Sequence, residues 1–386
     1  MTEVEAEADG LILPKFVALD SSHLGAVARD IFSKDKVRQR RAVEFQRAFD
    51  SSGSVLALCW HHVQELLSYG DDVVRAQRMD FIKSLPIVAG INSFGGQPYV
   101  GTIIDIQCFE VAIAFRQPAA SVTAIRDAAA KAMFQLGSGA DLIRAIVDAH
   151  SLLRPVFARQ ESRNQEIVAI TRSDLAGISH VKVVDLLNQP SRSPAEIEMQ
   201  LKRFEEKLRQ DIRRRGDQRI VNPESVSTAF VTDVRQRGMA AILAGNPGEQ
   251  ILLMHDIDVS EIGPETTVGD VGAMGAFRRK LSVLNRTLNF PWSALKRRVT
   301  EDRLPSGVIE AAAAKYHPDT REWDGSELTD RHLASLSAYC DLTYVDKRTH
   351  EAFRQARQKS KQFANLVRRT EKAAEYTAIY GHIISV

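Results

Sequence analysis

Short apolar runs that end at an acidic or polar residue and lead into helical patterns constrain the fold of this chain most. Residues 15–20 (KFVALD) and 55–60 (VLALCW) each have the character of a buried strand followed by a helix. Residues 342–346 (LTYVD) form a third such run near the end of the chain. Strands that alternate with helices are typical of a parallel sheet covered by helices. The sequence therefore predicts an α/β fold around a central parallel sheet.

The middle of the chain has a different pattern. Residues 87–91 and 101–115 contain β-branched runs, separated by a turn-rich gap. Residues 121–136, 140–153 and 194–215 carry apolar side chains at three- and four-residue spacing, which predicts helices. A chain of 386 residues is also long enough for two folding units. We therefore expect a disordered acidic leader at 1–14, an α/β domain formed by 15–115 and 315–386, and a mainly α-helical insert at 116–314.

Composition limits the classes of function and location. The formal net charge is only +2, so the chain as a whole is not a polycation that binds nucleic acid. Cys59, Cys108 and Cys340 form no CxxC pair, which favours buried thiols in a reducing compartment over disulfides or a zinc site. No apolar stretch approaches the roughly 18 residues of a membrane span. We expect a cytoplasmic protein without a membrane partner.

Several carboxylates stand at the ends of the predicted strands or on the helices beside them. Asp20 ends the first strand, and Glu65 lies in the helix after the second. Asp330 opens a helix near the C-terminus, and Asp341 and Asp346 flank the last strand. Ligands of open parallel sheets bind outside the carboxyl ends of the strands. Asp20 and Asp346 are expected to meet at that edge if their strands are neighbours.

The chemistry of such a cluster points to a cation. Four acids without basic partners repel one another unless a cation lies among them. Oxygen ligands of this kind suit Mg²⁺ or Mn²⁺ better than zinc. These metals activate water and stabilise the leaving oxygen of a phosphodiester. The residue types therefore favour metal-dependent phosphodiester hydrolysis.

Three motifs together are similar to the PIN-domain family of metal-dependent ribonucleases. They are LDSSHL at 19–24, HHVQELL at 61–67 and TDRHLASLSAYCDLTYVDKRT at 329–349. The resemblance covers about 15–115 and 315–370 and implies a three-layer α/β/α fold with a central parallel sheet, split by the insert. It implies an endoribonuclease with Mg²⁺ or Mn²⁺ and an RNA substrate, with DNA as the alternative. The acids that it places at the site are Asp20, Glu65, Asp330 and Asp346, with Asp341 as an accessory metal ligand.

The chain departs from the family pattern at two points. Compact PIN domains hold their acids within far fewer residues, so a long insertion must separate the two halves here. Many members also carry Thr two residues before the last acid, where this chain has Tyr344. The local contact to water or metal at that position is therefore expected to differ.

Each acid also has a purely structural alternative. Asp20 and Asp330 precede helices and would then act only as N-caps, although Ser21 or Ser22 could cap the first helix instead. Asp346 would pair with the basic residues that follow it. Glu65 would lie on a solvated helix face.

The residues around the acids have two interpretations as well. His61 and His62 lack a His or Cys partner at ligand spacing, so we expect them to pack or cap. Ser22 either contacts substrate or caps a helix. Arg348 and the basic residues near it either hold RNA phosphates or form a solvated face. The alternative function is a non-catalytic PIN-like scaffold whose helical insert binds a protein or nucleic-acid partner.

Overall fold

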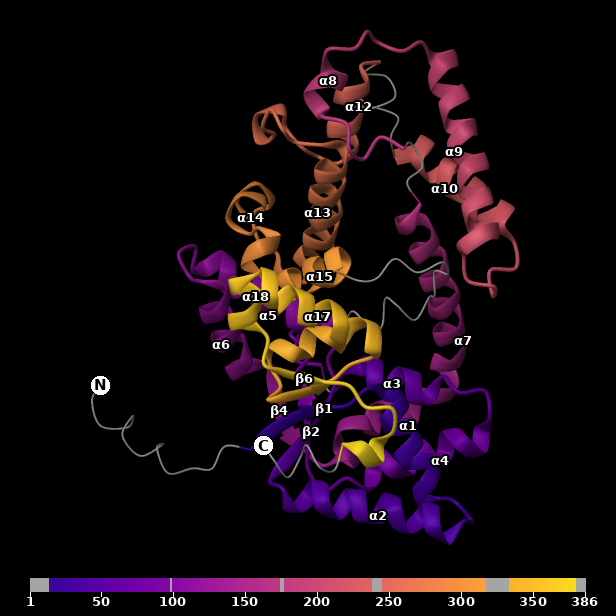
Figure 1. The fold of residues 1–386 in the computed structure, drawn as a ribbon, viewed down its shortest axis with the longest axis vertical. Coiled ribbons are helices and arrows are strands. Elements are labelled where there is room, and N and C mark those ends of the chain that lie inside the picture. Colours follow the sequence, from indigo (N-terminus) through magenta and orange to yellow (C-terminus); the bar gives the residue numbers. More distant parts are fainter. Residues whose placement is uncertain (1–13, 98, 174–176, 238–244, 317–332, 380–386) are drawn as a thin grey trace, which may run out of the picture. The chain divides into compact units, whose positions relative to one another are not determined.

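The computed structural model describes residues 14–97, 99–173, 177–237, 245–316 and 333–379 (Figure 1). The chain divides into two compact units. The first comprises Met1–Arg154, Asp302–Pro318 and Asp330–Val386, and the second comprises Pro155–Glu301 and Asp319–Thr329. The early and late parts of the chain thus belong to one unit.

A six-stranded sheet organises the first unit, in the order β4-β3-β2-β1-β5-β6. Neighbouring strands are parallel except β3 and β4, which are antiparallel. The sheet is therefore mixed, whereas the sequence predicted a parallel one. Its strands are β1 (Lys15–Ala18), β2 (Ser54–Leu58), β3 (Val88–Ile91), β4 (Phe134–Gly137), β5 (Leu342–Tyr344) and β6 (Arg369–Glu371).

The first strand lies in the middle of the sheet and joins the two ends of the chain. Val17 is in register with Leu56 of β2 on one side and with Leu342 of β5 on the other. β1, β2 and β5 coincide with the three apolar runs singled out in the sequence. The α/β class predicted from these runs is confirmed.

Nine helices lie wholly within the described part of the first unit, and they fall into two groups by their contacts. The first group follows the early strands and comprises α1 (Ser21–Ile31), α2 (Lys36–Ser51), α3 (Trp60–Leu67) and α4 (Asp72–Ser84). The second comprises α5 (Ile103–Arg116), α6 (Val122–Met133), α15 (Pro305–Tyr316), α17 (Lys347–Lys359) and α18 (Lys361–Leu366). Short 3-10 helices are η3 (Glu301–Arg303), η4 (Ser335–Ala338) and η5 (Tyr376–Ala378).

Two segments differ from the prediction. Residues 101–115 looked β-branched but form α5, because Thr102 and Asp105 make a capping box and the helix is buried on most sides. Residues 134–136, the end of a predicted helix, belong instead to β4, which pairs with β3. Because β4 belongs to the sheet, the boundary expected at 116 lies before the observed division at Pro155.

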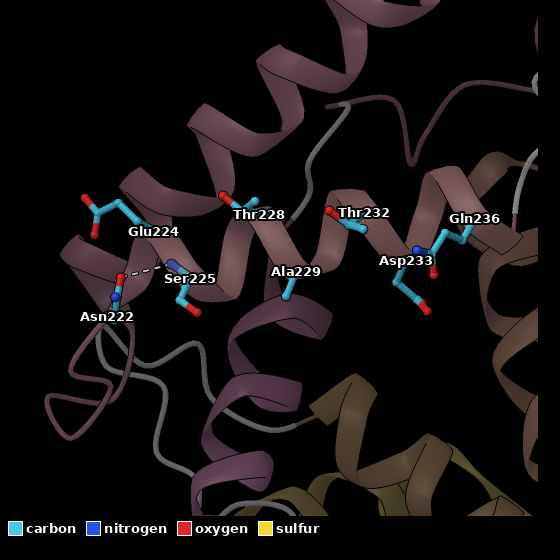
Figure 2. A pocket seen from close by; sticks show the side chains of 8 residues that line it. All are labelled: Asn222, Glu224, Ser225, Thr228, Ala229, Thr232, Asp233 and Gln236. Atoms are coloured by element: carbon cyan, nitrogen blue, oxygen red, sulfur yellow. Dashed lines mark hydrogen bonds between the residues drawn. The ribbon is translucent and has the colours of Figure 1, made fainter.

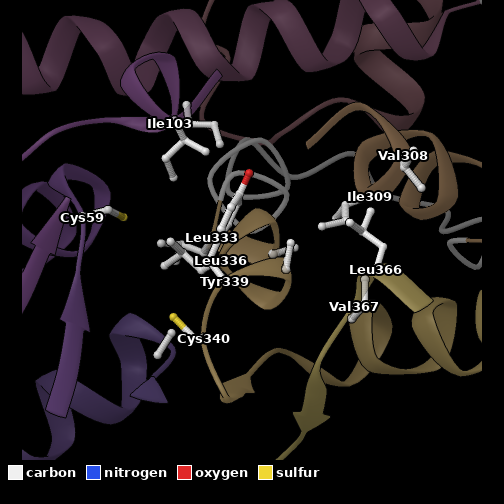
Figure 3. Close-up of a cluster of buried hydrophobic side chains, with 14 of the residues drawn as sticks. Cys59, Ile103, Val308, Ile309, Leu333, Leu336, Tyr339, Cys340, Leu366 and Val367 are labelled. Atoms are coloured by element: carbon white, nitrogen blue, oxygen red, sulfur yellow. The ribbon is translucent and has the colours of Figure 1, made fainter. Parts of the chain in front are cut away.

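A cluster of buried side chains joins segments from both ends of the chain (Figure 3). It includes Cys59 and Ile103 from the early part and Ile309, Tyr339 and Leu366 from the late part. All three cysteines are buried and form no disulfide, as the sequence predicted. The shared core makes the early and late segments one folding unit.

The second unit is helical among its described residues. α7 (Gly139–Arg172) runs from the first unit into the second. The remaining helices are α8 (Val183–Leu187), α9 (Pro194–Arg215), α10 (Pro223–Arg237), α12 (Pro247–Met254), η2 (Val259–Glu261), α13 (Val268–Leu288) and α14 (Trp292–Arg298). Separate small clusters pack these helices, one around Leu208 and Ile212 and another around Leu252 and Val271. These helices lie within the stretch 116–314, for which the sequence predicts a mainly helical insert.

One face of α10 is polar and hollowed (Figure 2). Ser225, Thr228, Thr232 and Gln236 are among the residues that line it. Of the helices described, none is both long enough and apolar enough to cross a membrane.

Candidate functional site

The order of the strands defines where a ligand would bind. From β1 the chain builds the sheet outward through β2 and β3, and the late strands β5 and β6 extend the other side of β1. The direction of strand addition therefore reverses between β1 and β5. In open α/β sheets the crevice beyond the carboxyl ends of strands at such a reversal is the usual ligand site.

Asp20 lies at this reversal, two residues beyond β1. It is the N-cap of α1, and its Oδ1 accepts a hydrogen bond of 2.7 Å from the backbone N–H of Ser22. The sequence left open whether Asp20, Ser21 or Ser22 caps this helix, and the structure assigns the cap to Asp20. The cap fixes the carboxylate at the sheet edge and uses one oxygen, so capping and ligand binding are compatible.

Glu65 approaches Asp20 from α3, the helix that follows β2. Partial burial raises the pKa of Glu65, and the negative charge of Asp20 raises it further. The hydroxyl of Ser21 is close enough to lower that pKa in part, yet Ser21 Oγ has no hydrogen bond of good geometry among the described residues. Two carboxylates and the hydroxyl of Ser21 thus gather at the end of β1.

Asp346 occupies the equivalent position two residues beyond β5. It is the N-cap of α17, and its Oδ1 accepts from the backbone N–H groups of Arg348 and Thr349 at 2.7 and 3.1 Å. Its Oδ2 accepts from the hydroxyl of Thr349. A carboxylate has about four acceptor sites, so this cap leaves Asp346 about one.

Asp341 lies at the other end of β5, and this corrects the expectation that it joins the other acids. Its Oδ2 accepts a hydrogen bond from Phe16 N, and its Oδ1 is paired with Arg368 Nη1 at 2.5 Å. Because five residues of extended chain span about 16 Å, Asp341 is remote from Asp346. Its role in this structure is to join strands.

The other predicted site residues have mixed placements. Asp330 lies outside the described residues. Ser22 is exposed and its backbone N–H serves the Asp20 cap, while Arg348 is exposed and contributes its backbone N–H to the Asp346 cap. Within the described part of the chain, no group of three or more His, Cys, Asp or Glu is arranged to hold a metal ion.

His62 contacts the residue that follows β1 and so supports the end of this strand. Its Nδ1 accepts from Cys59 N at 3.2 Å, so Nε2 carries the proton and donates to Leu19 O at 2.8 Å. Burial lowers the pKa of His62 to about 4, and this keeps the ring neutral. The packing and capping role expected for His62 is confirmed, and the bond to Leu19 helps to position Asp20.

Glu110 is a buried acid that was not predicted from the sequence. Glu110 of α5 is fully buried and accepts hydrogen bonds of 2.6 Å from both Ser306 Oγ and Tyr339 Oη. Burial raises the pKa of Glu110 to about 7. The available signal was an acid in the middle of the mainly apolar stretch IIDIQCFEVAIAFR, beyond the capping Asp105.

Comparison of the chain with models of known protein families, with curated proteins and with solved structures finds no match.

Proposed function

We propose that the first unit is a PIN-like domain that hydrolyses phosphodiester bonds of RNA with the help of a divalent metal ion. The proposal depends on one relationship. Asp20 and Asp346 come from distant parts of the sequence, yet they follow the adjacent parallel strands β1 and β5 at the reversal of strand order. Glu65 joins Asp20 there from α3.

The helices of the first unit support a PIN-like layered fold. α1 to α4 contact one another, and α5, α6, α15, α17 and α18 form a second set of contacts. A central sheet with two such sets fits the three-layer α/β/α arrangement expected from the sequence. β4 is then an added edge strand.

The residues at the carboxyl edge fit Mg²⁺ or Mn²⁺ in part. Within the described residues one side-chain oxygen of Asp20 accepts a hydrogen bond, and Glu65 and the Ser21 hydroxyl lie beside this carboxylate. Like charges held this close favour a cation between them. A bound Mg²⁺ or Mn²⁺ would supply an activated water and neutralise charge on the leaving oxygen.

A second candidate function is a PIN-like scaffold that binds a partner through its helical insert without catalysis. Two observations favour it. The cap uses most of the acceptor capacity of Asp346, and no metal-holding group of three is present in the described residues.

A matched pair of variants separates the two candidates. Asp20 and Asp35 are both N-caps in the first unit, and Asp35 accepts from Val37 N and Arg38 N at the start of α2. Asn is as good an N-cap as Asp, so Asp20→Asn and Asp35→Asn both preserve their helices. Only Asp20→Asn removes a charge from the proposed site.

The measurement is cleavage of single-stranded RNA by the full chain with Mn²⁺ or Mg²⁺, with EDTA as the blank. We expect Asp35→Asn to match the unaltered protein and Asp20→Asn to lose activity by roughly 100-fold or more. If the folded protein left RNA intact in the presence of Mn²⁺, the nuclease proposal would be overturned and the scaffold function would remain. Cleavage that survives Asp20→Asn would show a contaminating nuclease or another site, and either result counts against the proposal.

A further inference from the structure

A strongly basic stretch lies in the second unit and is not used by the proposed site. Residues 271–300 contain seven Arg and Lys residues and no Asp or Glu, although the whole chain carries a net charge of only +2. The stretch forms most of α13 and all of α14, which contact each other. Such local clustering gives a positive potential that the overall composition conceals.

Two of the seven basic residues, Arg278 and Lys296, pair with acids of the segment before α13. Arg278 is buried, pairs with Glu261 and donates to the backbone oxygen of Asp256. Lys296 pairs with Asp256 at 3.0 Å. These contacts fix α13 and α14 to residues 256–261.

The remaining residues, most of which also make contacts within the protein, form what we call the α13–α14 basic surface: Arg279, Lys280, Arg286, Arg297 and Arg298. All but Lys280 are exposed. Arg279 and Arg286 are seven residues apart, so they lie on the same face of α13, about 10 Å apart along its axis. The helix dipole favours a cation in the last turn of a helix, but it does not explain cations in the middle of α13.

The apolar residues of these helices indicate which polyanion the surface fits. A helix that binds a lipid surface presents a broad apolar face beside its basic one. Here Phe277, Leu281, Leu284 and Leu295 are buried within the unit, and Val283 is the one large apolar side chain of α13 and α14 that is clearly exposed. The surface is therefore charged without an apolar face, which suits a phosphate backbone in solution.

We propose that the α13–α14 basic surface binds the phosphate backbone of single-stranded RNA. The choice of RNA rests on the proposed nuclease function, whereas the surface itself is defined by its own charges. Binding of this kind is mainly electrostatic, so affinity should fall steeply as salt rises.

Binding is measured by fluorescence anisotropy with the full chain and a labelled oligouridine, in EDTA so that RNA is not cut. The test variant carries Arg286→Gln and Arg297→Gln. The control carries Lys202→Gln and Arg203→Gln, which are exposed basic residues of α9, and both variants remove two positive charges. We expect the test variant to weaken binding about tenfold or more, and to reduce the slope of log affinity against log salt by about 1 to 2. The control should change neither quantity appreciably.

Three results would overturn the inference: no binding of oligouridine, equal losses in both variants, or binding only to vesicles of phosphatidylcholine and phosphatidylserine. Failure of this inference can be distinguished from failure of the proposed nuclease function. If the native protein and Asp20→Asn both bind RNA but neither cleaves it, the nuclease proposal fails and the RNA-binding surface remains. If the native protein cleaves RNA and the α13–α14 substitutions leave binding intact, only this inference fails.

Discussion

Asp341 Oδ2 accepts a hydrogen bond of 2.8 Å from the backbone N–H of Phe16, and this bond ties the start of β5 to β1. The other oxygen of Asp341 is paired with Arg368. We predict that Asp341→Ala lowers the free energy of unfolding by about 1–3 kcal/mol, because Phe16 N and Arg368 both lose their acceptor. Urea denaturation measures this change.

Glu351→Ala is the matched control, because Glu351 pairs with Arg354 on an exposed helix surface. Exposed pairs of this kind contribute roughly 0–1 kcal/mol. RNA cleavage per folded molecule should be unchanged in Asp341→Ala. If Asp341→Ala unfolded like the unaltered protein but no longer cleaved RNA, Asp341 would belong to the active site.

We expect Glu65 to be required for RNA cleavage although it does not stabilise the fold. Burial and the charge of Asp20 raise its pKa, so its ionised form is disfavoured in the folded protein. We predict that Glu65→Gln leaves the free energy of unfolding unchanged or raises it by up to about 1 kcal/mol while it abolishes RNA cleavage. Glu44→Gln, an exposed acid of α2, serves as the control for both measurements. A destabilised Glu65→Gln variant that still cleaves RNA would contradict the assignment.

The sheet was predictable where each strand carried its own signal. β1, β2 and β5 are short apolar runs bounded by polar residues, and their direction places Asp20 and Asp346 at one edge. The FQLG sequence of β4 carries no such signal, because its strand character comes from pairing with β3. α5 was obscured because a helix buried on most sides loses its amphipathic period.

The candidate site was predictable to a similar degree. The closeness of Glu65 and Asp20 follows from adjacent strands and the helix after β2. The direction of β5 already separates Asp341 from Asp346, but short spacing in the sequence suggested that they act together. Caps were ambiguous because Asp20 and Ser21 are both good capping residues, and only the backbone geometry decides between them.

Gly101 fixes the loop beyond β3 against the start of α3. Its N–H donates to Ile91 O, and its carbonyl oxygen accepts from Trp60 N. A Cβ at this position would lie 2.5 Å from Asn92 O. We predict that Gly101→Ala lowers the free energy of unfolding by about 1–3 kcal/mol, because the backbone must shift. At Gly70 a Cβ meets nothing within 4 Å, so Gly70→Ala should be neutral or slightly stabilising. Equal effects of the two substitutions on thermal unfolding would count against this close approach.

Glu110 makes the first unit sensitive to pH. It connects α5 to Ser306 at the start of α15 and to Tyr339. Burial raises its pKa from 4.5 to about 7, and the nearby charge of Glu310 adds to this effect. Between those two values the folded protein holds a proton that the unfolded chain has released. Stability therefore falls as pH rises from 4.5 to 7, by an amount on the order of 3 kcal/mol.

The variant Glu110→Gln isolates this contribution, because Gln retains an acceptor for Ser306 and Tyr339 but does not ionise. His62 and His255, whose pKa values are lowered to about 4, act in the opposite direction and destabilise the fold as pH falls below 6.5. They are common to both proteins and cancel in the difference. We predict that the unfolding free energy of Glu110→Gln, relative to the native protein, rises by on the order of 3 kcal/mol from pH 4.5 to pH 7. Chemical denaturation at a series of pH values tests this. A difference that stays constant across the series would mean that Glu110 does not change its charge in the folded protein within this range.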